Sequence, residues 1–488
     1  MIQTRMSTTL TRIAAFVLVV LVAAPLFAQI SGNSSFERFD RQLELIQRET
    51  DARALSGIPA DKRALLDYGG YLSMDYFSVD DSNLQNHGLR QYQLVTYARF
   101  NLDAAQEAYI RGRFQYNDFN PGDAFENSDP GYHGFLDRAY YKFDSQGWQR
   151  SHGQTVSDFG FTFEGGRDLI YWGNGLTLSE ILDGAFIHTS WNDTSLDLIA
   201  GLTPQHTVDI DPSRPHFEDN TNRGFYGSML SQQIGKHKVY SYALLQRDYN
   251  SDNVGFESGI RTKYDYNSNY FGIGAQGAIT DRLLYGVEYV YENGKNLSNS
   301  FIINGFNLQQ QDQGHSAISA SAFDGRLDFL VLDRRKTRFS FEMIAATGDD
   351  DRIQTSTTFA GNKKGTADLA FNGFGLLNTG LAFAPQVSNV LIFRVGGVTF
   401  PLPDHSAFER AQLGVDFFIY NKFDADAPID ESTTNKNYLG CEPDIFLNWQ
   451  ITSDVTLAIR YGIFFPGAAI INDSENRQFF GAGVTYAF

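Results

Sequence analysis

Charged residues recur inside segments whose other residues alternate between apolar and polar. Arg111 and Arg113 are two apart, so both point to one face of an extended strand, the face that also carries Glu107. One carboxylate cannot neutralise two guanidinium groups, so this pair, with Arg138 from the next segment, is the best candidate for a row of cations. Such a row of fixed positive charge can bind anions or select them for passage.

The same alternation assigns further charged side chains to the polar faces of other segments. The cations on these faces are Arg99, Arg111, Arg113, Arg138, Lys142, Arg338, Arg394 and Arg460. The anions are Glu107, Glu288, Glu342, Asp416, Glu442 and Asp444. A charge in the middle of a strand is costly in a packed core but costs little in a water-filled lumen. Two interpretations stay open: these groups bind a solute, or they pair across strands and stiffen the wall.

The elements that carry these faces are predicted to be β-strands. Residues 480–488 show the pattern most clearly, since every second residue is apolar and the sequence closes on Phe488. Strands with one face in lipid hydrocarbon and aromatic rings near the headgroups show this alternation. Segments 107–117, 338–346, 412–420 and 455–464 repeat it, so we expect an all-β chain.

The composition favours one closed barrel over several soluble domains. The 488 residues include 41 Phe, 25 Tyr and 45 Gly but only 13 Pro, and no apolar run after residue 28 is long enough for a transmembrane helix. No linker or shift in composition marks a domain boundary. A sheet closed on itself also satisfies every backbone polar group, which a lipid environment requires. We therefore predict a single transmembrane antiparallel β-barrel over residues 67–488.

Counting strands backwards from Phe488 predicts eighteen of them. Bacterial barrels with both termini in the periplasm need an even number, and the last strand runs inward from the cell surface. The count excludes Phe371–Pro385 from the membrane and assigns it to an extracellular loop. The long connections then all fall on one side of the membrane, at residues 117–134, 168–183, 203–222, 250–268, 294–314, 348–388, 423–437 and 466–476.

Two segments are predicted ahead of the barrel. Basic residues precede a short apolar run, and small residues extend to Ala28, so we expect a signal peptide over residues 1–28, with an N-terminal membrane anchor as the alternative. Residues 29–66 form a periplasmic segment in which Ser34–Leu55 is a short amphipathic helix. This helix either packs on the periplasmic mouth of the barrel or binds a periplasmic export partner.

The sequence gives little indication of a disulfide, a metal site, a catalytic site or a nucleic-acid-binding site. The single cysteine, Cys441, cannot form an internal disulfide. The loop with His206 and Asp209 has metal-binding residue types but no recognised spacing, so we predict neither a metal nor a cofactor. His188 and Ser190 lack an orienting acid at a suggestive spacing, so we predict no enzyme. No basic stretch indicates nucleic-acid binding, and the net charge of −18 belongs largely to solvated loops, where divalent ions could bridge to lipopolysaccharide.

Several short blocks resemble the alginate-export family of bacterial outer-membrane barrels. They are Gly166-Arg167-Asp168 with Leu182-Asp183-Gly184-Ala185, then Leu284–Tyr289, Ala346–Asp350, Leu439–Asp444 and Tyr461–Gly467. Their order and spacing carry the resemblance, although Asp168 stands where the family usually has Gln. The resemblance implies an 18-stranded barrel that passes an anionic polysaccharide through an arginine-lined constriction. It also adds Arg167 to the candidate residues.

We therefore expect a channel in the outer membrane of a Gram-negative-type bacterium, inserted by the barrel assembly machinery and in contact with lipid and lipopolysaccharide. Its cargo is expected to be an exported anionic polysaccharide such as a polyuronate. The expected pore-lining residues are Arg99, Arg111, Arg113, Arg138, Arg167, Arg394, Arg460, Glu288, Glu442 and Asp444. Two rival functions stay open: a general or oligosaccharide-uptake porin, and a structural or adhesive barrel whose lumen is closed by loops.

Overall fold

The structure is a computed structural model. It describes residues 38–39, 41–49, 64–123, 125, 132–214, 221–250, 254–257, 259–304, 307–355, 357–471 and 475–488. The expected signal peptide, residues 1–28, lies outside the described residues, as does much of the expected segment 29–66.

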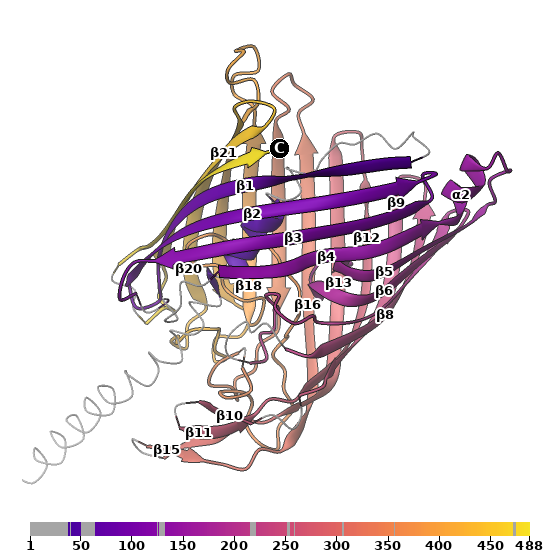
Figure 1. The fold of residues 1–488 in the computed structure, drawn as a ribbon. Coiled ribbons are helices and arrows are strands. Elements are labelled where there is room, and N and C mark those ends of the chain that lie inside the picture. The colour runs from indigo at the N-terminus through magenta and orange to yellow at the C-terminus, as the bar shows by residue number, and fades with distance from the viewer. Residues whose placement is uncertain are drawn as a thin grey trace, which may run out of the picture.

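One sheet of eighteen antiparallel strands closes on itself in the described part of the chain (Figure 1). Its strands are β1 (Ala64–Asp80), β2 (Asn86–Leu102), β3 (Gln106–Phe119), β4 (Tyr132–Asp144), β5 (Phe159–Trp172), β6 (Leu178–Trp191), β7 (Thr194–Leu202), β8 (Arg223–Ile234), β9 (His237–Asp248), β12 (Tyr266–Ala278), β13 (Leu283–Leu297), β16 (His315–Leu330), β17 (Arg338–Ala346), β18 (Val390–Thr399), β19 (Ala411–Lys422), β20 (Tyr438–Gln450), β21 (Val455–Pro466) and β22 (Arg477–Ala487). The predicted fold class and strand number are confirmed.

The barrel closes between its first and last strands. β1 pairs with β22 from Tyr71 opposite Ala487 to Val79 opposite Phe479. Phe488 extends the ladder, since its N–H donates to the Gly70 carbonyl at 2.9 Å and its carbonyl accepts from the Gly70 N–H at 3.1 Å. The terminal strand predicted from alternation is therefore the strand that completes the barrel.

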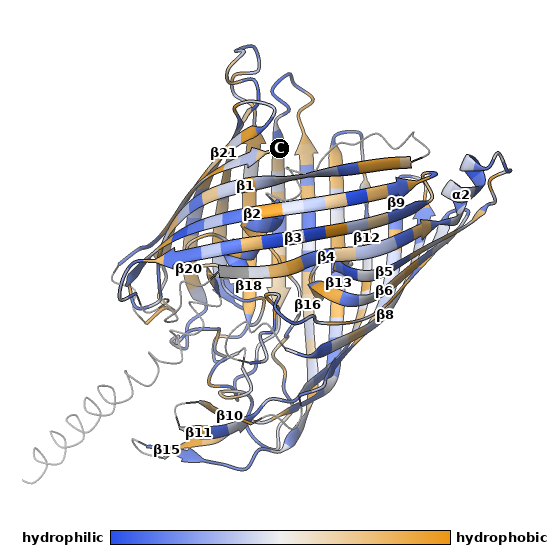
Figure 2. Cartoon of the chain, viewed as in Figure 1, coloured by the Kyte–Doolittle hydropathy of each residue, from blue (hydrophilic) through white to orange (hydrophobic). Residues whose placement is uncertain are grey.

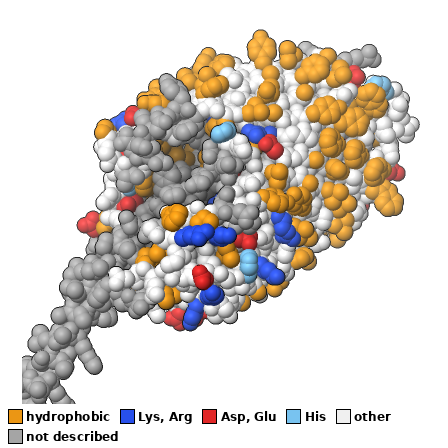
Figure 3. Space-filling model, turned by 60° about the horizontal axis from the view of Figure 1, so that its bottom comes forward, with side chains coloured by type: hydrophobic (Ala, Val, Ile, Leu, Met, Phe, Trp, Pro, Cys, Tyr) orange, Lys and Arg blue, Asp and Glu red, His pale blue; other side chains and the backbone are white. Residues whose placement is uncertain are grey.

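The alternation along each strand separates a lumen face from an outer face. In β2 the odd-numbered residues from 87 to 95 are buried, whereas the even-numbered residues from 90 to 96 are exposed. Figure 2 shows the same alternation of hydropathy along the strands, and Figure 3 shows apolar side chains over much of the outer wall. Within the residues that the structure describes, no helix has the length and apolar character needed to cross a membrane.

The connections differ in length at the two ends of the barrel. One end carries mostly tight turns, such as the two residues between β6 and β7, and the helix α2 (Ser145–Ser151) between β4 and β5. The other end carries the long connections, two of which are extended by the hairpins β10 (Val254–Glu257) with β11 (Ile260–Lys263) and β14 (Phe301–Asn304) with β15 (Asn307–Gln310). Phe371–Pro385 lies in the connection between β17 and β18 and forms no strand of the barrel wall, as predicted, but its backbone binds Glu442 on the lumen face and does not form the extracellular loop that was expected.

The connection between β5 and β6 differs from its prediction. Both strands continue into the range predicted as loop, and they pair with each other up to Trp172 opposite Leu178. However, β5 pairs with β4 only as far as Arg167 opposite Ala139, and β6 pairs with β7 only as far as Asp183 opposite Leu202. The tip of this hairpin, residues 168–182, therefore leaves the wall of the barrel while keeping its own ladder.

The N-terminal helix lies inside the barrel, which corrects its predicted periplasmic position. Residues 38–39 and 41–49 are helical, and their apolar stripe of Phe39, Leu43 and Ile46 is buried. Phe39 packs on Phe77 of β1 and Phe119 of β3, with ring centroids 6.2 and 6.4 Å apart. The apolar stripe of an amphipathic helix requires an apolar surface to pack on. Side chains on the lumen faces of β1 and β3 supply this surface, which the sequence did not identify.

Candidate functional site

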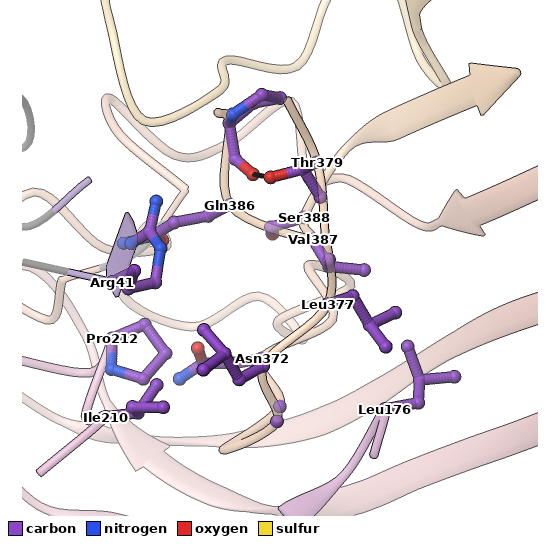
Figure 4. Close-up of a pocket in the computed structure, with 14 residues that line it drawn as sticks. Arg41, Leu176, Ile210, Pro212, Asn372, Leu377, Thr379, Gln386, Val387 and Ser388 are labelled. Carbon is purple, nitrogen blue, oxygen red and sulfur yellow. Dashed lines mark hydrogen bonds between the residues drawn. The ribbon is translucent and has the colours of Figure 1, made fainter. Parts of the chain in front are cut away.

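Four inward segments fill the middle of the lumen. They are the N-terminal helix, the β5–β6 hairpin tip, the loop after β7 and the connection between β17 and β18. Figure 4 shows Arg41, Leu176, Ile210 and Asn372, one from each segment, around a shared cavity. Its volume of about 40 Å³ holds no more than a few water molecules. The structure therefore describes a lumen narrowed by its own chain.

A glutamate of the far wall holds the hairpin tip. Glu288 of β13 accepts hydrogen bonds from the Asn174 N–H at 2.5 Å and from the hydroxyls of Tyr240 at 2.6 Å and Tyr242 at 2.7 Å. The Asn174 side chain also donates to Asp324 of β16 at 3.1 Å. Two hydrogen bonds from Asn174, one from its backbone and one from its side chain, thus tie the tip to β13 and β16 and fix its inward position.

Glu442 of β20 holds the connection between β17 and β18 in the same manner. Its carboxylate accepts three consecutive backbone N–H groups, from Leu381 at 2.6 Å, Ala382 at 2.7 Å and Phe383 at 2.8 Å. Consecutive backbone donors form a concave site that suits an anion, and here the anion is the protein's own carboxylate. Asp444, two residues further along the same face, is also buried. Glu288 and Glu442, both predicted to line the pore, therefore anchor inward segments.

The predicted arginine row exists, but a carboxylate lies within it. Arg111 and Arg113 of β3 both form ion pairs with Asp137 of β4, and the Arg113 Nη2 to Asp137 Oδ2 distance is 3.2 Å. Both guanidinium groups are almost completely buried. Arg138 pairs with Asp168 at 3.0 Å, and Arg99 donates to Glu107 at 2.8 Å. Of the two interpretations left open for these side chains, cross-strand pairing describes this conformation.

Asp137 was missed because a β-bulge changes the alternation at that point. Arg111 lies opposite Arg138, but Gly112 lies opposite Leu136, so Asp137 is the extra residue of β4. Strict alternation places Asp137 on the outer face, next to an inward Arg138. The bulge instead lets both neighbours reach the lumen. Gly112 lies at the register shift and Gly134 lies nearby, but glycines are common along this chain and do not locate the bulge in the sequence.

Arg167 does not line the lumen, which corrects its predicted role. The pairing of β5 with β6 continues without a register shift from Phe159 to Trp172, so no bulge between these two strands alters the face on which Arg167 lies. Arg167 consequently lies on the outer face, where its guanidinium binds Asp183 at 2.6 Å and the Leu136 carbonyl at 2.8 Å. That carbonyl belongs to the part of β4 that has lost its ladder partner on β5, so Arg167 satisfies an exposed edge.

The remaining candidate cations lie on the lumen face. Arg394 of β18 pairs with Glu342 of β17 at 2.9 Å and approaches Asp416 of β19 at 4.0 Å. Arg460 of β21 pairs at 2.5 Å with Glu49, a residue of the N-terminal helix. The partner of Arg460 is therefore a carboxylate from outside the barrel wall.

The acidic residues of the loops form hydrogen bonds and ion pairs within the loops themselves. Asp349, Asp350 and Asp351 bring carboxylate oxygens within 4.8 Å of one another. The Asp349 carboxylate accepts the N–H groups of Asp351 and Leu369, both at 2.9 Å, which is a turn-forming role. In the loop after β7, Asp211 pairs with the buried Arg223 at 2.8 Å. These carboxylates therefore stabilise the conformation of their own loops.

The architecture defines a class of protein: an outer-membrane β-barrel channel of the porin type. The sequence profile of the alginate export family matches residues 170–480, which is well over half of the chain. The protein belongs to the alginate export family, as the sequence blocks indicated. No curated protein matches the sequence.

Several solved structures share the fold. OccAB3 of Acinetobacter baumannii aligns with a TM-score of 0.52 and 9% identity, covering 87% of this chain and 99% of that one. OpdK of Pseudomonas aeruginosa, in a structure with vanillate, aligns with a TM-score of 0.51 and 10% identity over 87% of this chain and 98% of that one. OpdO of the same organism gives 0.50 and 10%, over 87% and 97%. At these identities the likeness concerns the barrel alone.

Proposed function

We propose that this outer-membrane channel exports an anionic polysaccharide, such as a polyuronate, by passive passage through the lumen. The observation that carries the proposal is the row of inward arginines on adjacent strands, Arg99 on β2, Arg111 and Arg113 on β3 and Arg138 on β4. Guanidinium groups bind carboxylates in a bidentate manner, and successive carboxylates of a polyuronate could exchange with the acidic partners along this row. Membership of the alginate export family supports the same cargo.

A second candidate function is the uptake of small organic anions. It is favoured by the shared barrel of OpdK, whose structure holds vanillate. The cavity between the inward segments, about 40 Å³, is too small for a polymer or for an organic anion, so either function requires these segments to move. Insertion by the barrel assembly machinery and contact with lipopolysaccharide belong to the proposal as well.

Ion current across planar bilayers tests the proposal. The full chain is reconstituted, and uronate oligomers are added together with a neutral oligosaccharide of the same length as the matched control. An export channel for polyuronate should be anion-selective and should be blocked by the charged oligomer at concentrations where the neutral one has no effect. Equal block by both oligomers would favour a general porin. A lack of current in both the wild type and the variant Gln47→Ala with Glu49→Ala would contradict the proposal that the protein is a channel.

A further inference from the structure

The N-terminal helix follows the lumen from the mouth toward the middle of the barrel. At one end, Arg38 contacts Asp430 and Glu431 in the long connection between β19 and β20. At the other end, Glu49 reaches Arg460, near the centre of β21. The helix therefore lies across the route that a transported molecule would take.

The contacts at the mouth form a buried network of four charges. Arg38 binds Asp430 through two nitrogens at 2.8 and 2.6 Å and Glu431 at 2.9 Å. Arg477 of β22 binds the same Glu431 at 2.7 and 2.9 Å. Both guanidinium groups lie over the ring of Phe383, 5.1 and 5.9 Å from its centroid. This network fixes the outer end of the helix with charge-assisted hydrogen bonds.

The contacts in the middle of the lumen involve the predicted anion-binding arginines. The Gln47 side-chain oxygen accepts from Arg113 at 2.6 Å, and its nitrogen donates to Gln91 of β2 at 3.1 Å. The Glu49 carboxylate accepts from Arg460 at 2.5 Å. A carboxylate and an amide oxygen of the helix thus take positions on two guanidinium groups that a uronate carboxylate would otherwise take.

We propose that the helical residues 38–39 and 41–49 are a displaceable plug that mimics the substrate: Gln47 and Glu49 occupy the carboxylate-binding positions of Arg113 and Arg460 until the polymer replaces them. This inference rests on the proposed export of a polyanion and adds its binding residues and its regulation. Replacement of Glu49 by a uronate keeps Arg460 paired, so the exchange leaves no buried guanidinium without a partner. A polymer presents many carboxylates, so its effective concentration at the second arginine is high once the first is bound.

A double substitution of the lumen end provides the test. Gln47→Ala with Glu49→Ala removes both mimicking groups from the full chain and leaves the network of Arg38 intact. Glu44→Gln is the matched control, because Glu44 pairs at 2.7 Å with Arg48 on the helix itself. The double variant should spend at least about tenfold more time in the conducting state than the wild type, since losing partly buried polar contacts worth about 1.4 kcal/mol suffices for that factor. It should also be blocked by lower concentrations of a uronate oligomer. The control should behave as the wild type.

The possible outcomes separate the plug from the channel. Equal currents and equal block in the wild type and the double variant would overturn the plug and leave the export proposal standing. An absence of current in both the wild type and the double variant would overturn the plug proposal and the export proposal together, provided that circular dichroism shows the β-sheet of both proteins to be folded.

A second measurement does not depend on conductance. Gln47→Cys in a Cys441→Ser background places a single thiol on the helix, and a membrane-impermeant thiol reagent reports its exposure. Adding the uronate oligomer should raise the labelling rate several-fold, whereas the neutral oligosaccharide should leave it unchanged. A rate that the charged oligomer does not alter would show that the helix is not displaced.

Discussion

The arginines of β2 to β4 and the glutamates of β13 and β20 all face the lumen, but they differ in the kind of partner that they bind. On β2 to β4, arginines face side-chain partners, namely Asp137, Glu107 and the amide of Gln47. On β13 and β20, Glu288 and Glu442 face backbone N–H groups of inward segments. A side-chain partner can be exchanged for a solute group without unfolding anything, whereas a backbone partner can be released only by moving a loop. The partner, and not the sign of the charge, therefore separates candidate binding groups from structural ones.

The largest effect should follow from removing the anchor of the longest inward connection. Glu442→Ala leaves the N–H groups of Leu381, Ala382 and Phe383 without their acceptor, which should cost about 1–3 kcal/mol for each buried donor. Limited proteolysis should then cut within residues 347–389 much faster than in the wild type. Glu442→Gln retains an acceptor oxygen and should give a smaller increase. Equal cleavage of all three proteins would contradict the anchoring role.

The arginine side is tested by its effect on ion selectivity. Arg111→Ser with Arg113→Ser removes two positive charges and leaves Asp137 without its partners, so the reversal potential in a salt gradient should shift toward cation selectivity. The matched change among the glutamates, Glu288→Gln, should shift selectivity less. The Glu288 carboxylate is hydrogen-bonded to the tip of the β5–β6 hairpin and is not available to ions in the lumen. An unaltered reversal potential in the arginine variant would rule out the constriction.

Neutralising the acid between the arginines should act in the opposite direction. Asp137→Asn leaves Arg111 and Arg113 as net positive charge on the lumen face, so anion selectivity should rise and a uronate oligomer should block several-fold more tightly. Block measured in the same bilayers checks this. Weaker block would indicate that Asp137 positions the arginines for the ligand and does not compete with it.

The charge network at the mouth predicts a dependence on pH. Burial alone raises the pKa of Glu431, but the guanidinium groups of Arg477 and Arg38 outweigh it and lower that pKa from 4.5 to about 2. A carboxyl group with a depressed pKa stabilises the folded network fully above pH 4.5, and this contribution is lost as the pH falls toward 2. The fraction of time in the conducting state should therefore be flat from pH 8 to 5 and rise below 4.5. Glu431→Gln should abolish the rise.

The smallest effect is expected from the outward arginine. Arg167 binds Asp183 and a backbone carbonyl on the outer face, so Arg167→Gln should leave ion selectivity unchanged. A change in reversal potential as large as that of the Arg111 and Arg113 variant would place Arg167 in the ion pathway and contradict the register of β5.

Alternation was sufficient to predict the wall of the barrel but not what fills it. It identified the terminal strand and excluded Phe371–Pro385, because a period of two is a local property of the chain. The partner of Glu442 lies some sixty residues earlier, in backbone amides that any sequence would provide. The stripe of Phe39, Leu43 and Ile46 predicted a helix with one buried face, but a stripe does not say which apolar surface covers it. Bulges such as that at Asp137 likewise depend on the neighbouring strand and leave no local signal.

The seam between β1 and β22 has a consequence for the order of assembly. It joins residues 70–79 to residues 479–488, the most distant pairing along the described chain, so the loop it closes carries the largest entropic cost of any strand pair. Until that pairing forms, the other seventeen interfaces make an open sheet with two bare edges. The helix that precedes β1 is enclosed by the last step of this assembly. If the β1–β22 seam closes after the helix has entered the lumen, the folded barrel is blocked by the helix from the start. Displacing the helix to open the channel is then a separate step from folding.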